Sequence, residues 1–392
     1  MDIFEKCRNY TQAKEAIAGG FYPYFIPLDE NEGTEVEFEG KRLIMCGSNN
    51  YLGLTTHPKV KEAAVNAVNR FGTSCTGSRF LNGTLAMHVQ LERELAEFVG
   101  KEEALIFSTG MQVNLGTISS LVSRDDVVIL DKEDHASIVD GARLGYGKIE
   151  RFRHNDAAHL ERVLQSIPDN LGKLVVVDGV FSMGGDLADL KSIVPMAEKY
   201  GARVMVDDAH GIGVTGRGRG TAHEFGLTDK VDLIMSTFSK SFASLGGFIA
   251  GDEAVVHYIK HTARSLIFSA SIPAANAAAA LAALDIIRNE PERVDRVNAI
   301  ADRVRKDMRA MGFNVGESVT PIIPVIIGDD QKTFMAWKAL FKNGVFVNPV
   351  IAPAVPQGSQ LLRTSYMATH TDEQVDRVME TFRVVGKDVG II

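Results

Sequence analysis

The sequence contains few cysteines. There are three in 392 residues, Cys7, Cys46 and Cys75, an odd number at wide spacing. Such a set forms neither a disulfide framework nor a metal cluster, and it is typical of proteins that work in a reducing compartment. We therefore expect a cytoplasmic protein without a metal site.

The sequence also lacks a membrane-length apolar run and an excess of positive charge. The best candidate for a span, residues 274–287, is alanine-rich and runs into Arg288 and Glu290, and the N-terminus has no signal-peptide core. The formal net charge is −8, whereas a nucleic-acid-binding protein usually carries a basic face. These absences argue against nucleic acid as the main partner and leave peripheral membrane contact open.

Most of the chain has the composition and length of a soluble α/β protein. It is 45% apolar and 23% charged, and its length suits one large domain with a smaller companion. From residue 86 onward apolar strands alternate with helical segments, which predicts a mainly parallel sheet covered by helices on both faces. The predicted helices are 86–99 and 111–122, and the predicted strands are 104–108, 127–130, 174–178, 203–207 and the two apolar runs within 234–251.

The two ends of the chain have a different character. Residues 2–19 have helical spacing, and a small hairpin surrounds Glu39, Gly40 and Lys41. After residue 272 the predicted helices are 274–290, 292–311, 331–343 and 371–388, with strands 321–327, 344–348 and 361–366. We predict an N-terminal segment (1–45), a large α/β domain (46–272) and a small C-terminal α+β domain (273–392).

A single lysine, Lys240, stands between two apolar runs in residues 234–251 (IMSTFSKSFASLGGFIAG). Burial of a lysine penalises its charged form, lowers its pKa and favours a nucleophilic amine. Thr237, Ser239 and Ser241 add hydroxyls that could bind an anion. By itself the pattern also fits a lysine in a surface loop.

Four further features stand at or near the ends of predicted strands, where parallel sheets bind ligands. Residues 106–114 (IFSTGMQVN) form a strand-to-helix turn whose free N–H groups suit a phosphate. His135 follows one strand, Asp207 ends another with His210 three positions later, and Arg363 lies in an apolar strand. Taken singly, residues 106–114 fit an ordinary strand-to-helix turn and His135 fits a helix cap. Asp207 and His210 fit a metal site, although no further ligands lie at suitable spacing. Arg363 fits an internal ion pair. Together they meet the needs of pyridoxal 5′-phosphate (PLP).

Along nearly its full length the chain resembles the α-oxoamine synthases, a branch of the fold-type-I PLP-dependent transferases. The stretches that carry this resemblance are 48–53 (SNNYLG), 77–84 (GSRFLNGT), 134–141 (DHASIVDG), 178–183 (DGVFSM), 207–210 (DDAH) and 237–240 (TFSK). Further stretches are most similar to the bacterial members that use L-serine and palmitoyl-CoA. They are 151–155 (RFRHN), 268–273 (FSASIP), 345–348 (VFVN), 352–356 (APAVP) and 389–392 (VGII).

The resemblance implies a role for each matching residue. Lys240 would form the Schiff base with PLP and move protons at the substrate Cα, and His135 would stack on the pyridine ring. Asp207 would pair with the ring nitrogen, and His210 with the phenolic oxygen, together with Ser182. The phosphate would be held by Gly110, Met111, Thr237 and Ser239, joined by Ser269 and Ala270 from the second subunit of a homodimer. Asn50 and Arg363 would lie near the amino-acid substrate.

The implied reaction is condensation of L-serine with a long-chain acyl-CoA to 3-ketosphinganine, CoA and CO₂, the first step of sphingolipid synthesis. Two siblings are the alternatives, 2-amino-3-ketobutyrate CoA ligase and 8-amino-7-oxononanoate synthase, and a silent scaffold subunit is a third. The sequence departs from the family pattern at Gly184, Met111 and Ile351. Ile351 stands where some serine-using members have an arginine, which leaves Arg363 to bind the carboxylate.

Overall fold

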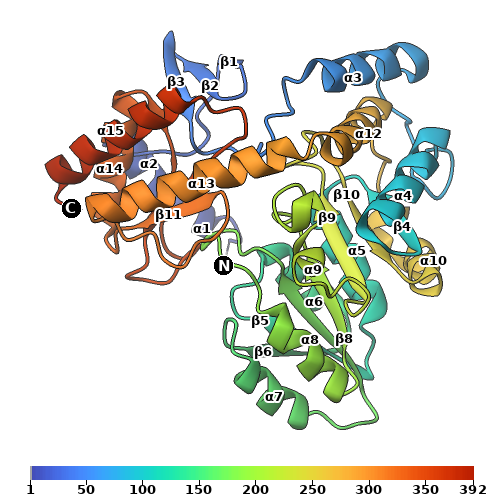
Figure 1. Ribbon diagram of the computed structural model, residues 1–392. Coiled ribbons are helices and arrows are strands. Elements are labelled where there is room, and N and C mark those ends of the chain that lie inside the picture. The colour runs from blue at the N-terminus through green and yellow to red at the C-terminus, as the bar shows by residue number, and fades with distance from the viewer. Residues whose placement is uncertain (1) are drawn as a thin grey trace.

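The structure, a computed structural model, describes residues 2–392. Its largest element is a seven-stranded sheet with the order β4-β10-β9-β8-β7-β5-β6 (Figure 1). Only β10 is antiparallel to its neighbours, so the predicted mainly parallel sheet is confirmed. Its strands are β4 (Glu103–Phe107), β5 (Asp126–Asp131), β6 (Lys148–Phe152), β7 (Gly172–Asp178), β8 (Arg203–Asp207), β9 (Leu233–Thr237) and β10 (Gly247–Gly251).

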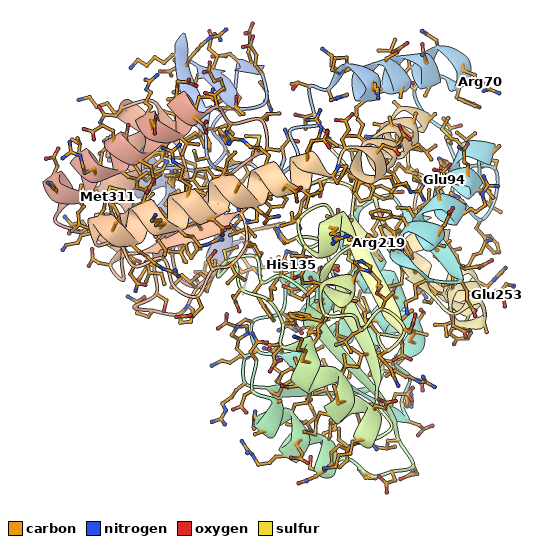
Figure 2. All side chains as sticks on the ribbon, viewed as in Figure 1. Arg70, Glu94, His135, Arg219, Glu253 and Met311 are labelled. Carbon is orange, nitrogen blue, oxygen red and sulfur yellow. The ribbon has the colours of Figure 1, made fainter. Side chains whose placement is uncertain are left out.

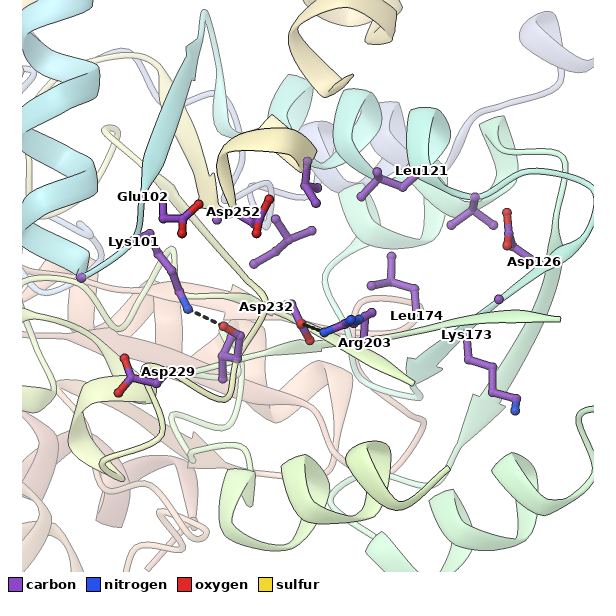
Figure 3. Close-up of a pocket in the computed structure, with 17 residues that line it drawn as sticks. Lys101, Glu102, Leu121, Asp126, Lys173, Leu174, Arg203, Asp229, Asp232 and Asp252 are labelled. Atoms are coloured by element: carbon purple, nitrogen blue, oxygen red, sulfur yellow. Dashed lines mark hydrogen bonds and ion pairs between the residues drawn. The ribbon is translucent and has the colours of Figure 1, made fainter. Parts of the chain in front are cut away.

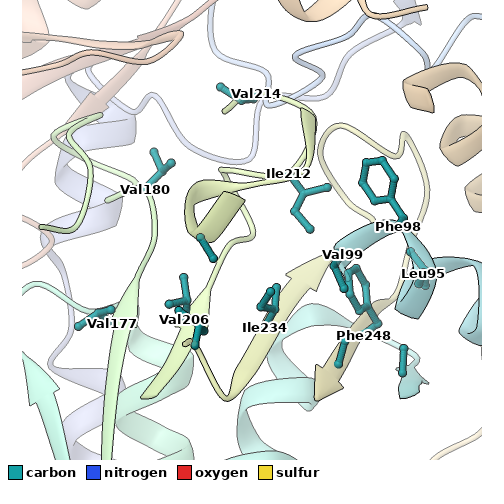
Figure 4. Packing of buried hydrophobic residues seen from close by; sticks show 14 of the residues in the cluster. Leu95, Phe98, Val99, Val177, Val180, Val206, Ile212, Val214, Ile234 and Phe248 are labelled. Carbon is teal, nitrogen blue, oxygen red and sulfur yellow. The ribbon is translucent and has the colours of Figure 1, made fainter. Parts of the chain in front are cut away.

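Apolar side chains cover both faces of this sheet. In β7, Val175 and Val177 belong to one buried cluster while Leu174 and Val176 belong to another, as the two-residue period of a strand requires. Figure 4 shows the first cluster, in which Val177 and Val206 lie on the sheet and Phe98 comes from α4. A strand buried on both sides has to be apolar throughout, which explains why these strands were recognisable in the sequence.

Helices supply the outer layers. The first face is covered by α4 (Ala86–Val99), α7 (Ala157–Gln165), α8 (Leu190–Lys199) and α12 (Ala274–Asn289), and the second by α5 (Gly110–Leu121), α6 (Ala136–Leu144) and α10 (Glu253–Thr262). Shorter pieces are α9 (Thr221–Glu224), α11 (Arg264–Ile267) and a 3-10 turn at Gly216–Gly218. Both α5 and α6 begin just beyond a strand, which directs their N-termini to the carboxyl edge of the sheet.

The smaller part of the molecule combines both ends of the chain. β12 (Val345–Phe346) pairs in parallel with β3 (Lys41–Met45), and so completes the sheet β1-β2-β3-β12. A second sheet has the order β11-β14-β13. The other elements here are β1 (Glu30–Asn31), β2 (Glu35–Phe38), β11 (Ile322–Ile326), β13 (Asn348–Val350), β14 (Leu361–Ser365), α14 (Asp330–Lys342) and α15 (Asp372–Val389).

One long helix connects the two parts. α13 (Glu292–Met311) places Val294 and Val297 in the core of the large sheet, and Ile300 and Met308 in a second core (Figure 1). The preceding helix α12 packs on α3 (Pro58–Phe71) and α4.

The domain limits at residues 45 and 272 stay a prediction. Across residues 2–392, no helix combines the length and apolarity that a membrane crossing requires.

Three local predictions were wrong. Residues 2–19 form two short helices, α1 (Glu5–Arg8) and α2 (Gln12–Ala18), because neither buries a side chain that would hold one longer helix in place. Strand 344–348 divides at Val347 into β12 and β13, which pair in different sheets. Strand β6 was not predicted, because it lies at the sheet edge and is only partly buried.

Candidate active site

A cavity of about 270 Å³ opens at the carboxyl edge of the large sheet. Figure 2 shows one of its residues, His135, between the large sheet and the smaller part. The sheet topology brings together residues that are far apart in the sequence, because parallel strands present their carboxyl ends at one edge. Among the predicted site residues, those that line the cavity are Gly110, Met111, His135, Asp207, His210, Thr237, Ser239 and Lys240.

Lys240 lies in the turn between β9 and β10. Burial lowers the pKa of its amine to about 8, an effect that Asp207 and Asp178 oppose and that Arg363 reinforces. The chain returns to β10 through Gly246, where φ is +127° and a Cβ atom would lie 2.7 Å from the ring of Phe238. This lysine therefore lies at the cavity, and its lowered pKa makes it easier to deprotonate, as a nucleophilic amine requires.

The carboxylate of Asp207 is held from two sides. Asn114 Nδ2 donates a 2.7 Å hydrogen bond to Asp207 Oδ2, and the backbone N–H of Ala209 donates to Oδ1. Asn114 Nδ2 also donates to Ser137 Oγ at 2.8 Å, and Ser137 Oγ lies 2.7 Å from His135 Nδ1. Asn114, whose role the sequence did not reveal, thus links the carboxylate to the imidazole.

A second acid lies beside Asp207. Burial raises the pKa of Asp178 well above its usual value, and the charge of Asp207 raises it further. Burial likewise raises the pKa of Asp208 to about 7, although Thr221 donates two hydrogen bonds to its carboxylate. The raised pKa values favour the neutral forms of Asp178 and Asp208 more than in water.

The first turn of α5 offers free donors to the cavity. Thr109 caps the helix by accepting from the N–H of Gln112, and within residues 2–392 the N–H groups of Gly110 and Met111 have no acceptor. A Cβ atom at position 110 would lie 2.7 Å from Thr237 Oγ1, so only glycine fits there. Thr237 Oγ1 and Ser239 Oγ are 2.9 Å apart across from this turn. Free N–H groups and hydroxyls at a helix N-terminus suit a phosphate.

These donors, the Asp207 carboxylate and the Lys240 amine fit the three polar ends of PLP: its phosphate, its ring nitrogen and its aldehyde. His135 supplies a ring next to this space. Burial lowers the pKa of His135, which favours its neutral form and permits stacking on an aromatic cofactor.

Arg363 is buried and is not paired with an acid. Its Nε donates to the carbonyl oxygen of Ser182 at 2.7 Å, and Nη2 donates to Asn49 Oδ1 at 2.9 Å. No carboxylate in residues 2–392 lies within ion-pair distance of its guanidinium. A buried guanidinium without an acidic partner destabilises the folded protein, and a substrate carboxylate would compensate its charge.

The side chain of the predicted site residue Asn50 makes its polar contacts within its own turn. The amide of Asn50 is used within its own turn, where Nδ2 donates to Thr55 Oγ1 and Oδ1 accepts from the N–H of Leu54. The neighbouring Asn49 instead accepts from Arg363. That Asn50 lies near the amino-acid substrate stays a prediction.

Three other predicted residues do not line the cavity. Ser182 contributes its carbonyl oxygen to Arg363. Ser269 Oγ accepts from Gln112 Nε2 at 2.8 Å, and Ser108 Oγ donates to the carbonyl of Ala270. Residues 269 and 270 therefore contact the first turn of α5 and the turn before it in their own chain, and their role in a partner's site stays a prediction.

An ion-pair cluster of His154, Asp131 and Asp186 lies beyond the end of β5. His154 Nδ1 lies 3.0 Å from Asp131 Oδ1, and its Nε2 lies 2.9 Å from Asp186 Oδ2. Burial alone would lower the pKa of His154, but the hydrogen bonds to Asp131 and Asp186 outweigh it and raise this pKa to about 10. A charged His154 thus joins the end of β5 to the loop that carries Ser182.

A larger cavity, of about 740 Å³, lies at the opposite, amino edge of the sheet (Figure 3). Lys101 Nζ donates to the carbonyls of Thr228 and Val231, and Arg203 pairs with Asp232 at 2.7 Å. These cations are thus already paired within the fold, so this cavity offers less to a ligand than the smaller one.

Comparisons with known proteins agree with this geometry. The family model described as aminotransferase class I and II matches residues 41–382. A protein named serine palmitoyltransferase from Bacteroides thetaiotaomicron is 52% identical over 96% of this chain and 96% of its own. One of the same name from Sphingobacterium spiritivorum is 48% identical over 99% and 98%. A solved structure described as SPT with the PLP internal aldimine is 37% identical, covers 100% of both chains and has a TM-score of 0.97.

Proposed function

The chain belongs to the aminotransferase class I and II family, and within it we propose a PLP-dependent acyltransferase of the α-oxoamine synthase branch. It condenses L-serine with a long-chain acyl-CoA such as palmitoyl-CoA, and releases 3-ketosphinganine, CoA and CO₂. The observation that carries this proposal is that relatives named serine palmitoyltransferase share about half of their residues with nearly the whole chain. The presence of Lys240, Asp207 and His135 at one cavity argues against a silent scaffold.

Different residues of the cavity bind different parts of the cofactor. The N–H groups of Gly110 and Met111 and the hydroxyls of Thr237 and Ser239 bind its phosphate. Asp207 keeps a proton on the ring nitrogen, and His135 covers one face of the ring. So held, PLP supplies an electron sink for the negative charge that develops at the substrate Cα.

Lys240 both holds the cofactor and moves protons. Its amine would hold the cofactor by its aldehyde, and serine would displace it. Because burial lowers the pKa of this amine to about 8, about one tenth of it is unprotonated at pH 7, far more than for a lysine in water. The free amine can then remove the Cα proton of serine and later return one to the product.

Arg363 binds the substrate carboxylate, and Asn50 lies near the amino-acid substrate. The planar guanidinium can donate two parallel hydrogen bonds to a carboxylate. The contact between Arg363 Nη2 and Asn49 Oδ1 orients that guanidinium before serine arrives. A fixed carboxylate aligns the Cα–H bond with the Lys240 amine, which is a positioning effect.

The functional unit is a homodimer with shared active sites, and it works in the cytoplasm. Phe268 is 77% exposed and Met111 49%, on the surface next to Ser269 and Ala270. Large apolar side chains at such exposure are typical of a protein interface. A mixture of Lys240→Ala chains with chains altered at Ser269 and Ala270 tests the sharing. Heterodimers should regain activity at one composite site, and proven heterodimers without any activity would contradict it.

The substrates are tested by a panel. L-serine, glycine and L-alanine are each combined with palmitoyl-, acetyl- and pimeloyl-CoA, and CoA release is measured on the PLP-loaded protein. Serine with palmitoyl-CoA should give the highest rate. Preference for glycine with acetyl-CoA, or for alanine with pimeloyl-CoA, would identify one of the two siblings instead.

A further inference from the structure

Short polar contacts through Tyr51 and Asn49 join His210 at the cavity to Arg363 at the proposed carboxylate site. Tyr51 Oη lies 2.7 Å from His210 Nδ1 and 3.2 Å from Asn49 Oδ1, and Asn49 Oδ1 also accepts from Arg363 Nη2 at 2.9 Å. Tyr51 is completely buried in the loop between β3 and α3. Tyr51 belongs to the sequence motif 48–53, but the resemblance implies no role for it.

The single phenolic proton of Tyr51 can serve only one of its two neighbours. If it goes to His210 Nδ1, a neutral imidazole must carry its own proton on Nε2. If it goes to Asn49, Nδ1 must itself be the donor, and Nε2 is left with a lone pair. The contact to His210 is shorter by 0.5 Å, as the distances of 2.7 and 3.2 Å show, and the shorter contact favours His210 as the acceptor of the phenolic proton.

We infer that Tyr51 is a positioning residue that donates its proton to His210 Nδ1 and so fixes the imidazole proton on Nε2, on the cavity side. In that form His210 donates a hydrogen bond to the phenolic oxygen of the cofactor. The opposite tautomer would face that oxygen with a lone pair and repel it. The inference rests on the proposed function for the identity of the cofactor.

The surroundings keep both partners in the required forms. Burial lowers the pKa of His210 well below its usual value, and the nearby Lys240, Arg363 and His135 lower it further, so the imidazole stays neutral. Burial raises the pKa of Tyr51 to about 12, so the phenol keeps its proton in the working pH range.

Tyr51→Phe removes the hydroxyl and keeps the ring. Tyr366→Phe is the matched control, because Tyr366 is equally buried and its hydroxyl has no hydrogen-bond partner in residues 2–392. The first readout is the nitrogen-15 NMR spectrum of histidine-labelled protein, with His210 assigned by its loss in His210→Asn. The wild type and the control should show Nε2 protonated and Nδ1 bare, and Tyr51→Phe should show a mixture of tautomers.

The second readout is the pH at which the visible band of the bound cofactor changes, without substrate. A donor to the phenolic oxygen stabilises its negative charge, so weakening that donor should raise the midpoint in Tyr51→Phe by about 0.5–1 pH unit. The control should not shift. An unchanged midpoint, or an unchanged tautomer, in Tyr51→Phe would overturn the inference.

The two proposals fail in different ways. A wild type that binds no PLP would refute the proposed function, while the tautomer of His210 is still read in the cofactor-free protein. If Tyr51→Phe does not fold, the wild-type spectrum decides alone. A proton on Nδ1, or a charged imidazolium at neutral pH, would then overturn the role of Tyr51.

Discussion

Asn114 Nδ2 lies 2.7 Å from Asp207 Oδ2 and donates a hydrogen bond to it. The contact is buried, since neither residue is more than 4% exposed. Through Ser137 the same amide reaches His135, so one side chain on α5 contacts or connects to two of the groups proposed to hold the cofactor. In the proposed function this contact holds the carboxylate that keeps the ring nitrogen protonated.

Asn114→Ala should lower kcat/KM by about 10- to 150-fold, the equivalent of a hydrogen bond to a charged group. Asp207→Asn should cost more, several orders of magnitude, because it removes the charge itself. Thr117→Val is the control, since Thr117 lies on the same helix and its buried hydroxyl has no partner in the described chain. A loss below tenfold in Asp207→Asn would mean that another residue protonates the ring.

Lys240→Ala should abolish turnover and leave the fold intact. Without the amine, neither attachment of the cofactor nor removal of the Cα proton can occur. Lys101→Met is the control, because it removes another partly buried lysine, at the opposite cavity. CoA release and far-ultraviolet circular dichroism are the measurements. Turnover near the wild-type rate in Lys240→Ala would refute this assignment.

Arg363→Ala should weaken serine binding by about 1.5–3 kcal/mol, and Arg363→Lys by less, because lysine keeps the charge but loses the planar fork. The measurement is a serine titration of the cofactor's absorption band, alongside melting curves. Arg305→Ala is the control. Arg305 is also buried and donates to the carbonyl of Thr320, so its loss should lower stability without changing serine affinity. The same result for Arg363→Ala would make Arg363 purely structural.

The ion-pair cluster of His154 predicts a pH dependence of stability. An unfolded histidine has a pKa of about 6.5, and in the folded protein the value is raised to about 10. Because the folded state holds this proton more tightly, the stabilisation is complete below pH 6.5 and is lost as the pH rises through 10. The free energy of unfolding of the wild type minus that of His154→Gln should therefore be largest near pH 6 and shrink toward pH 10. Urea denaturation at several pH values measures it, and a constant or growing difference would contradict the cluster's charge.

Much of the fold could be predicted because its signals are local. Helix 86–99 has the predicted limits, and β7 and β8 are continuous apolar runs because both of their faces are buried. Strand 344–348 was predicted as one unit because nothing in its sequence shows that its two halves pair with different sheets.

The grouping of several predicted site residues at one cavity was predictable to the same extent. His135, Asp207 and Lys240 meet because the carboxyl ends of parallel strands share an edge. The contacts made by Asn114 and Tyr51 join residues 93 and 159 positions apart, and no local period reports them. Asn49 and Asn50 are identical in type, and only the geometry of their turn decides which one contacts Arg363.

The most direct test of the proposed reaction follows the carboxyl carbon of serine. L-serine labelled with carbon-13 at that carbon is incubated with palmitoyl-CoA and the PLP-loaded protein, and gas and lipid are analysed by mass spectrometry. The account predicts one labelled CO₂ for each CoA released, and unlabelled 3-ketosphinganine as the product. CoA release without labelled CO₂, or no 3-ketosphinganine while another amino acid and acyl-CoA react, would contradict it.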